Sequence, residues 1–303
     1  MNIYDAIIIG AGPAGLSAGI YLARFRRKAL IIDAEKGRSS LPGVYHNIAG
    51  FLKPVERRKL RQLGAKQAGM YGAEEVFDKV INIESMDEDK FKLVSENNIY
   101  FARNIIFCTG IMDNWPEAEG FMDYVGYTLH SCPVCAGYET IDKRVIVVGD
   151  ERVAGYALEI WPYTKKIKVV SSVNSEKIDL KYMNSLKKMN IPVYQGKIVK
   201  FVGQENKIEK VILDNGMELE ADIVYSAQGS HVKSELAKKL GVAIDEGDCI
   251  IVNKLQETNI NGIYAAGDVT SFDNKQVVTA LYEGYMAAHS IHKKLLREEI
   301  DKI

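Results

Sequence analysis

Two cysteines separated by two residues, Cys132 and Cys135, have the spacing in this sequence that best suits chemistry. The sulfurs of such a motif can close a small disulfide ring, and their thiolate pKa values are often low, which suits reversible redox exchange. The same spacing also supplies half of a zinc site, which needs two further ligands. The sequence has no second Cys-x-x-Cys, and its histidines at 289 and 292 are interpreted as packing and dimer surface on the last predicted helix. We therefore expect a redox-active disulfide and no metal, with a chemically inert pair as the remaining alternative.

The rest of the composition bounds the class of protein. Four cysteines in 303 residues are too few for a disulfide-stapled secreted scaffold, and Cys108 and Cys249 read as buried strand residues. The chain carries 39 basic and 40 acidic residues, a balance that excludes a dedicated nucleic-acid binder. The apolar run 6–23 contains glycines and Pro13, which favours a strand, turn and helix over a membrane span. We expect a soluble cytoplasmic protein without nucleic-acid or membrane partners.

A glycine-rich turn follows the first apolar strand, predicted over residues 5–9. The turn reads Gly10-Ala11-Gly12-Pro13-Ala14-Gly15, and a helix is expected after it. The first glycine permits a tight turn, the second lets the backbone approach a pyrophosphate, and the third lets the helix pack close to the strand. The next predicted strand, 29–33, ends in Asp33, where a ribose-binding carboxylate is expected. The pattern predicts dinucleotide binding.

Two later segments resemble the flavoprotein disulfide reductases. Residues 258–270 run from a predicted strand into Gly267-Asp268, where that superfamily has the Asp that binds the flavin's ribityl chain. Residues 104–110 end in Thr109-Gly110 and resemble the Ala-Thr-Gly strand end of the same superfamily. The resemblance implies that the dinucleotide is FAD.

Taken from Ile7 to about His292, the chain resembles the low-molecular-weight thioredoxin reductases. The matching motifs include HNIAGF at 46–51, with Asn47 expected beside the flavin, CPVCAG at 132–137, and Lys275-Gln276-Val277 by the flavin ring. The resemblance implies that FAD reduces the Cys132–Cys135 disulfide, that Cys135 faces the flavin, and that Cys132 exchanges with thioredoxin. It also implies a homodimer.

The order of these motifs predicts an α/β fold with two doubly wound, dinucleotide-binding-like domains, the second inserted in the first. Residues 1–112 and 236–303 are expected to form the FAD domain, and 113–235 the inserted domain with the cysteine pair. The chain is expected to cross between them near Pro116 and near 236–241.

The inserted domain departs from the family at its own nucleotide site. Strand 145–148 leads into Gly149-Asp150-Glu151-Arg152-Val153-Ala154, so Glu151 replaces the glycine that approaches a pyrophosphate and adds repulsive charge. The stretch 171–175, where the family has arginines for a 2′-phosphate, contains no arginine. These changes argue against NADPH. They make the chain resemble most the ferredoxin-dependent flavin thioredoxin reductases, which lack pyridine nucleotide motifs.

A basic stretch at 53–66 bears on that electron donor. Ferredoxins are usually acidic, and complementary charge steers encounter. A solvated helix face is an equally good interpretation of these residues. The candidate docking residues are Lys53, Arg57, Arg58, Lys59 and Arg61.

Other functions stay open. Ala136 stands where the NADPH-type family has a proton-donating Asp and where dithiol oxidases of the gliotoxin-oxidase kind have a His, so the proton donor is unassigned; Glu139 and His130 are candidates. The alternatives are a dithiol oxidase, an NADPH-dependent thioredoxin reductase with an atypical site, and a non-catalytic flavoprotein that senses redox state.

Overall fold

The computed structural model describes residues 2–86, 90–270 and 275–303, and the chain divides into two compact units. Unit 1 comprises Met1–Leu41, Arg57–Met112 and Val232–Ile303, and unit 2 comprises Pro42–Glu56 and Asp113–His231. Both differ from the ranges expected from the sequence, because the segment 42–56 groups with the inserted unit and residues 232–235 with the first.

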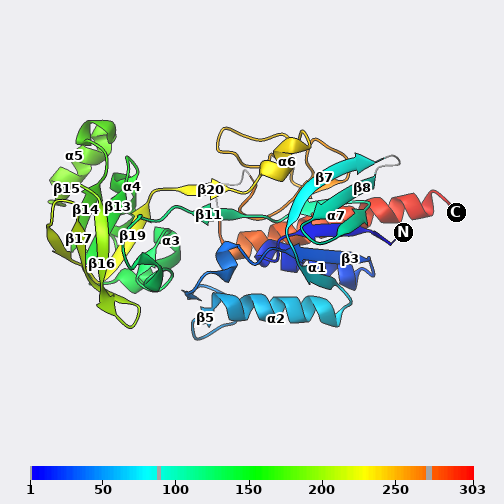
Figure 1. Ribbon diagram of the computed structural model, residues 1–303, viewed down its shortest axis with the longest axis horizontal. Coiled ribbons are helices and arrows are strands. Elements are labelled where there is room, and N and C mark those ends of the chain that lie inside the picture. The colour runs from blue at the N-terminus through cyan, green and yellow to red at the C-terminus, as the bar shows by residue number, and fades with distance from the viewer. Residues whose placement is uncertain (1, 87–89, 271–274) are drawn as a thin grey trace. The chain divides into compact units, whose positions relative to one another are not determined.

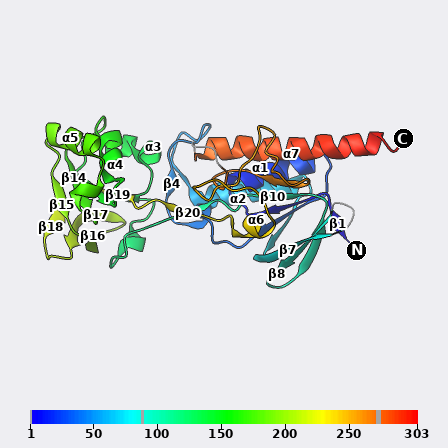
Figure 2. The same ribbon diagram turned by 90° about the horizontal axis from the view of Figure 1, so that it is seen from above.

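Unit 1 is built on a five-stranded parallel sheet with the order β21-β10-β2-β3-β6. A second sheet, β1-β9-β8-β7, is antiparallel except for its β1–β9 pair. Figure 2 shows α7 on one side of the parallel sheet and β7 and β8 on the other. The elements of unit 1 are β1 (Ile3–Tyr4), β2 (Ala6–Ile9), α1 (Pro13–Arg24), β3 (Ala29–Asp33), η1 (Arg38–Ser40), α2 (Arg57–Met70), β6 (Glu74–Phe77), β7 (Val80–Met86), β8 (Lys90–Ser95), β9 (Ile99–Ala102), β10 (Ile105–Phe107), α6 (Glu235–Lys239), β21 (Ile263–Ala265) and α7 (Val277–Ile300).

The inner strands β2, β3 and β10 of the parallel sheet in unit 1 are apolar, apart from Asp33 at the end of β3, because both faces of the sheet are covered there. Ile7, Leu30 and Ile105 point into a core shared with the second sheet, where they meet Phe91 and Leu93. Their neighbours in sequence, such as Ile8, Ile31 and Ile106, point to the opposite face, into a core formed with α1 and α7. The alternation follows the two-residue period of a strand.

Unit 2 repeats the same sheet plan in the order β12-β19-β13-β14-β15, and a three-stranded antiparallel sheet, β16-β17-β18, accompanies it (Figure 1). The elements of unit 2 are β4 (Val44–Tyr45), β5 (Val55–Glu56), η2 (Phe121–Asp123), β12 (Leu129–His130), α3 (Pro133–Ala136), η3 (Tyr138–Thr140), β13 (Val145–Gly149), α4 (Val153–Ile160), β14 (Ile167–Ser171), η4 (Ser175–Lys177), α5 (Leu180–Lys188), β15 (Val193–Gln195), β16 (Ile198–Gln204), β17 (Lys207–Leu213), β18 (Glu218–Glu220) and β19 (Ile223–Ala227).

The chain crosses between the units along two strands that pair with each other, β11 (Ile111–Asp113) and β20 (Ser230–Val232). The expected crossing at 236–241 is instead helix α6 and the turn after it. Leu236, Ala237 and Leu240 pack into the core of unit 1 there.

The predicted fold class is confirmed: each unit has a parallel sheet in which one strand, β2 or β13, lies between the next strand along the chain, β3 or β14, and a strand from much later in the chain, β10 or β19. Such a switch point leaves a crevice at the carboxyl ends of the strands, where dinucleotides bind in folds of this kind. Within the described ranges, none of the helices combines the length and apolar character that a membrane crossing requires.

Candidate functional site

Cys132 and Cys135 form a disulfide with a Cα–Cα distance of 5.3 Å. Cys132 stands in an extended conformation at the N-cap of helix α3, and its Sγ accepts a hydrogen bond from the backbone N–H of Cys135 at 3.1 Å. Both cysteines are partly exposed, whereas Val134 between them is 71% exposed. The pair is therefore accessible to a partner, and the N–H donor is placed to stabilise negative charge on the Cys132 sulfur.

Buried hydroxyl groups form hydrogen bonds with the short helix α3, which carries the disulfide. The Tyr225 hydroxyl on β19 and the Thr140 hydroxyl each donate to the Ala136 carbonyl, at 2.8 and 2.9 Å. Burial raises the pKa of Tyr225, so its hydroxyl remains a donor. On the other side, the Tyr156 hydroxyl on α4 donates to the Ser131 carbonyl at 3.2 Å. These bonds fix the loop that presents the cysteines.

One acid–base pair lies in the same unit as the disulfide. His46 Nδ1 and a Glu139 carboxylate oxygen are 3.2 Å apart, and both side chains are partly exposed. Glu139 follows Cys135 by four residues along α3, Gly137 and η3, all helical, so the two share a face. Ala136 is buried and carries no ionisable group. His130 packs against Tyr225, with the two rings tilted by 41° and their centroids 5.6 Å apart. The sequence predicts Glu139 as a candidate proton donor, but nothing in it predicts that His46 pairs with Glu139.

The glycine turn of unit 1 has the geometry of a phosphate cradle. A Cβ on Gly10, whose φ is +106°, would lie 2.4 Å from the Cys108 carbonyl oxygen, and one on Gly15 would lie 1.9 Å from the Gly10 oxygen. A Cβ on Gly12 would meet only Ser39 Oγ, at 4.0 Å, among the described residues. Pro13 and Ala14 open helix α1 without a side-chain cap at Gly12. The space and the N–H groups suit a pyrophosphate.

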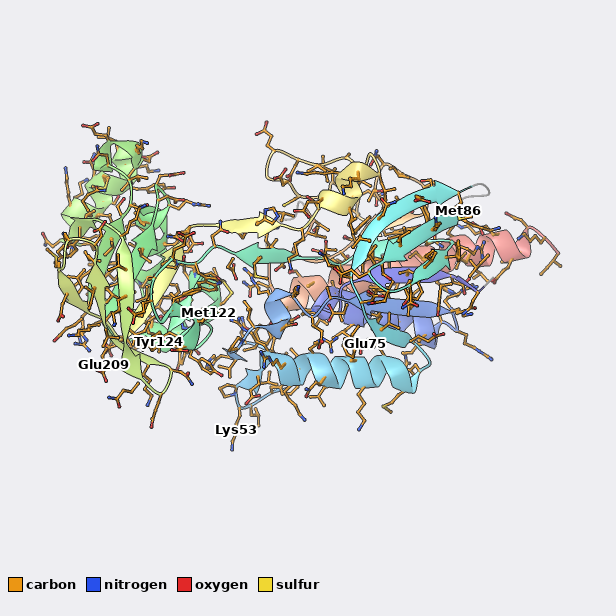
Figure 3. All side chains as sticks on the ribbon, in the orientation of Figure 1. Lys53, Glu75, Met86, Met122, Tyr124 and Glu209 are labelled. Atoms are coloured by element: carbon orange, nitrogen blue, oxygen red, sulfur yellow. A yellow bond between two sulfur atoms is a disulfide. The ribbon has the colours of Figure 1, made fainter. Side chains whose placement is uncertain are left out.

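Asp33 ends β3, where a ribose carboxylate was expected, and it is held by an arginine. Arg61 on α2 donates to Asp33 Oδ2 from Nη2 at 2.7 Å and from Nε at 3.2 Å. The same Nη2 donates to Glu75 on β6 at 2.7 Å. Figure 3 shows Glu75 beside α2. Burial raises the pKa of Glu75, although Arg61 opposes that rise.

The prediction that Arg61 belongs to an exposed docking surface is wrong. Its side chain is only 10% exposed, because both of its acidic partners draw it against the sheet. The guanidinium also lies 5.3 Å from the centre of the Phe77 ring. The run of basic residues in the sequence does not indicate that Arg61 pairs with Asp33 and Glu75, which are 28 and 14 residues away along the chain.

The remaining basic candidates differ in exposure. Lys53, Arg58 and Lys59 are exposed, and Figure 3 shows Lys53 at the outer edge of its segment. Arg57 is partly buried, and Arg58 Nε donates to the Ser40 carbonyl at 2.9 Å. Lys53 belongs to unit 2 and the others to unit 1.

Asp268 lies three residues after the end of β21. Its Oδ2 forms an ion pair with Arg38 Nη1 at 3.0 Å. Lys275 Nζ donates to the Asp268 carbonyl at 2.7 Å. The buried carboxylate of Glu283 on α7 accepts the Gly267 N–H at 2.6 Å. Burial raises the pKa of Glu283, and the bond from Gly267 opposes that rise. Arg38 and Glu283 lie outside the sequence motifs, so the sequence does not predict these contacts.

The other predicted cofactor residues of unit 1 lie at the ends of its elements. Thr109 donates to the Lys233 carbonyl at 2.5 Å, and Gly110 adopts a φ of +66°. Gln276 caps α7, which begins at Val277. Asn47 lies in unit 2, on the segment Pro42–Glu56.

The corresponding turn of unit 2 is charged. Asp150 and Arg152 form an ion pair, and the Arg152 backbone N–H also donates to Asp150 Oδ1 at 3.1 Å. Glu151 is exposed between them. Ser171 ends β14 and bonds to the Val173 carbonyl at 2.8 Å. This turn differs in chemistry from the uncharged turn at Gly10–Gly15.

The two unpaired cysteines are buried, as expected. Burial raises the pKa of Cys108, which keeps its thiol protonated. The sequence predicts both in strands, but neither lies in one. Cys108 directly follows β10, and Cys249 precedes the single bridging residue Ile250, with its Sγ 3.5 Å from Lys275 Nζ.

Comparisons with known proteins agree with this architecture. Residues 4–284 match the family model described as pyridine nucleotide-disulphide oxidoreductase. A thioredoxin reductase from Rickettsia prowazekii is 30% identical, covering 95% of this chain and 97% of that protein. A 34.2 kDa protein in the rubredoxin operon of Clostridium pasteurianum is also 30% identical, covering 94% of each chain. The structure of thioredoxin reductase from Streptococcus pyogenes superposes with a TM-score of 0.91 at 24% identity, covering 97% and 99% of the two chains.

The matched span includes the glycine turn, the cysteine pair and the Gly267-Asp268 segment, and nearly the whole chain aligns with full-length relatives. The chain therefore belongs to the pyridine nucleotide-disulphide oxidoreductase family.

Proposed function

We propose that this protein is an FAD-dependent thioredoxin reductase whose electrons come from reduced ferredoxin rather than from NADPH. The observation that carries the disulfide chemistry is the accessible Cys132–Cys135 disulfide, whose Cys132 sulfur already accepts a backbone N–H. Its relatives include thioredoxin reductases, which supports thioredoxin as the substrate.

The chemistry of the pair balances as follows. Two electrons and two protons convert the Cys132–Cys135 disulfide into two thiols. The Cys132 thiolate then attacks the disulfide of oxidised thioredoxin, and Cys135 displaces the reduced thioredoxin as the intramolecular disulfide reforms. The two protons pass to the thioredoxin thiols. The N–H of Cys135 stabilises the attacking thiolate.

The residues of unit 1 fit FAD. The Gly10–Gly15 turn would hold the pyrophosphate, Asp33 the adenosine ribose, and Asp268 the ribityl chain. Thr109, Gly110, Lys275, Gln276 and Val277 would complete the site in unit 1. Asn47, which belongs to unit 2, stays a prediction from the family resemblance. Bound flavin supplies a store for two electrons that can be filled one electron at a time.

The choice of donor rests on the turn after β13. Glu151 takes the place of the glycine that lets a backbone approach a pyrophosphate, and Asp150 adds a second carboxylate nearby. Two acidic side chains at that turn oppose a ligand that is itself negative. A relative encoded in a rubredoxin operon supports a one-electron iron protein as the donor. The exposed cations Arg58 and Lys59 would attract an acidic ferredoxin.

An anaerobic titration tests the proposal. The FAD-loaded protein is mixed with NADPH and, separately, with reduced ferredoxin, and the flavin absorbance is followed. We expect ferredoxin to bleach the flavin and NADPH to leave it oxidised. Bleaching by micromolar NADPH would contradict the ferredoxin assignment and would favour an NADPH-dependent reductase with an atypical site.

The same preparation separates the dithiol oxidase alternative. Reduced thioredoxin and a small-molecule dithiol are each supplied with oxygen, and oxygen consumption is measured. We expect little consumption, because Ala136 stands where the dithiol oxidases of the gliotoxin-oxidase kind have a His, and an alanine side chain is neither an acid nor a base. Rapid oxygen consumption without bleaching by ferredoxin would favour the oxidase. The homodimer and the cytoplasmic location remain predictions.

A further inference from the structure

The two units contain the same turn in matching positions. Gly10 follows β2, and its Cβ would lie 2.4 Å from the Cys108 carbonyl oxygen at the end of β10. Gly149 ends β13, and its Cβ would lie 2.5 Å from the Ala227 carbonyl oxygen at the end of β19. Two residues beyond those oxygens stand Gly110 and Gly229, with φ of +66° and +73°. The backbone of the cradle is thus retained in both units.

What lies on the two cradles differs. A Cβ on Gly110 would meet nothing within 4 Å among the described residues. A Cβ on its counterpart, Gly229, would lie 2.0 Å from Arg152 Nη1, 2.8 Å from Cζ and 3.0 Å from Nη2. The Arg152 guanidinium therefore covers Gly229, whereas no described residue covers Gly110, its counterpart in unit 1.

The anion position of the unit 2 cradle is also taken by the chain itself. Asp150 Oδ1 accepts the backbone N–H of Arg152, which immediately precedes α4, at 3.1 Å, and it accepts Arg152 Nε at 2.9 Å. Burial raises the pKa of Asp150, but the bonds from Arg152 outweigh it and hold that pKa below its usual value. A carboxylate and a guanidinium thus satisfy each other and the start of α4, where a phosphate would otherwise bind.

We infer that the Asp150–Arg152 pair is a built-in occupant of the unit 2 nucleotide cradle, and that it excludes dinucleotides from a fold that otherwise keeps their binding geometry. Asp150 substitutes for the phosphate at the start of α4, and Arg152 covers Gly229. The exposed carboxylate of Glu151, in the turn between β13 and α4, adds repulsion against a negatively charged pyrophosphate. This inference rests on the proposed use of a donor other than a pyridine nucleotide, and assigns that exclusion to three residues.

A graft of the unit 1 turn tests the inference. The triple variant Asp150→Ala/Glu151→Gly/Arg152→Pro gives unit 2 the residues Ala11, Gly12 and Pro13 of unit 1. Proline is compatible with the φ of −77° at Arg152. The probe is ADP-ribose, which carries a pyrophosphate and transfers no electrons. Binding is measured by calorimetry on FAD-loaded protein, so that the unit 1 site is filled. We expect the graft to bind at least about tenfold more tightly than the parent protein.

Two further variants keep the test decisive. Arg152→Ala removes the cover alone and is expected to give a smaller gain; it replaces the graft if the graft loses its circular dichroism spectrum or its FAD. Arg144→Ala is the matched control, since Arg144 forms a bidentate pair with Asp222 elsewhere in unit 2. It should leave ADP-ribose binding unchanged.

The outcomes separate this inference from the proposed function. Equal affinity in the parent, the graft and Arg152→Ala would overturn the inference, and so would an equal gain in Arg144→Ala. The parent's flavin reduction by ferredoxin is measured independently. If ferredoxin bleaches the flavin and the variants gain no affinity, only the inference fails. If the variants gain affinity and ferredoxin does not bleach the flavin, only the proposed donor fails.

Discussion

Arg61 holds the carboxylate of Asp33 through two hydrogen bonds, of 2.7 and 3.2 Å, from helix α2 to the end of strand β3. The pair links the helix that carries exposed basic residues to the carboxylate predicted to bind the FAD ribose. A third residue, Glu75, accepts a hydrogen bond from the same guanidinium nitrogen, Nη2. Arg61 therefore positions the Asp33 carboxylate, which is proposed to bind the FAD ribose, and Arg61 itself is too buried for a docking surface.

Replacing Arg61 with methionine should weaken both folding and FAD binding. The change keeps the apolar stem but leaves Asp33 and Glu75, which are mostly buried, without their shared cation. Breaking such a pair costs about 3 kcal/mol of unfolding free energy. Urea denaturation and FAD dissociation would measure the two effects. Adding Glu75→Gln to the variant should restore part of the stability, and no restoration would mean that carboxylate repulsion is not the cause.

Glu283 should act on the cofactor through Gly267. Glu283→Ala leaves the buried Gly267 N–H without its acceptor, which costs about 1–3 kcal/mol, and should raise the FAD dissociation constant about tenfold. Glu283→Gln keeps an acceptor oxygen and should retain FAD. Equal loss of FAD from both variants would show that the negative charge matters more than the hydrogen bond.

Much of the fold follows from short-range patterns. The strand predicted over 29–33 is β3. A short, almost wholly apolar run is typical of a parallel strand whose sheet is covered on both faces. The glycine turn could be predicted for a similar reason, since Gly10 and Gly15 fill spaces where a Cβ would collide with backbone. These features depend on residues near each other in sequence.

Features that depend on distant partners were not predictable. The segment 42–56 groups with unit 2, where a Cβ on Gly43 would lie 2.6 Å from the Gly126 oxygen. The pairing of His46 with Glu139 follows from that grouping. Nothing in the composition of 42–56 indicates which unit it joins, because the contact is made by backbone atoms of two glycines.

Protonation of Asp78 at low pH should lower the free energy of unfolding. Burial raises its pKa, but hydrogen bonds from Ser95, Asn97, Asn98 and the Lys79 N–H outweigh that effect and hold the pKa below its usual value. The carboxylate therefore stabilises the fold above the unfolded pKa, and this contribution is lost as the pH falls below about 4. Asp78→Asn should flatten the stability curve in that range, as measured by urea denaturation. An unchanged slope would mean that other carboxylates dominate acid unfolding.

The exposed charge on α2 should control the rate of reduction by ferredoxin. Lys59→Glu reverses one exposed cation and should lower the second-order rate about 3- to 10-fold at low ionic strength, with the difference shrinking as salt is added. Stopped-flow bleaching of the flavin would measure it. Lys302→Glu changes the net charge equally at the exposed C-terminus and is the control. Equal effects of the two variants would place ferredoxin elsewhere.

The two cysteines should have separate roles that trapping can distinguish. Cys132 accepts the Cys135 N–H, so it is the sulfur better stabilised as a thiolate and the one expected to attack thioredoxin. Cys135→Ser keeps that thiol but removes the sulfur that resolves the intermediate, so it should accumulate a mixed disulfide with oxidised thioredoxin. Cys132→Ser should form none and should still bind FAD, because the residues proposed for the FAD pyrophosphate and ribose lie in unit 1.

A non-reducing gel and mass spectrometry would identify the trapped adduct, and turnover should fall to background in both variants. Cys249→Ser is the control, since its buried thiol contacts Lys275 and Gly247 and takes no part in the exchange. It should keep full turnover. An adduct that forms with Cys132→Ser instead would exchange the roles of the two sulfurs. The bond from the Cys135 N–H would then orient the disulfide without selecting the attacking thiolate.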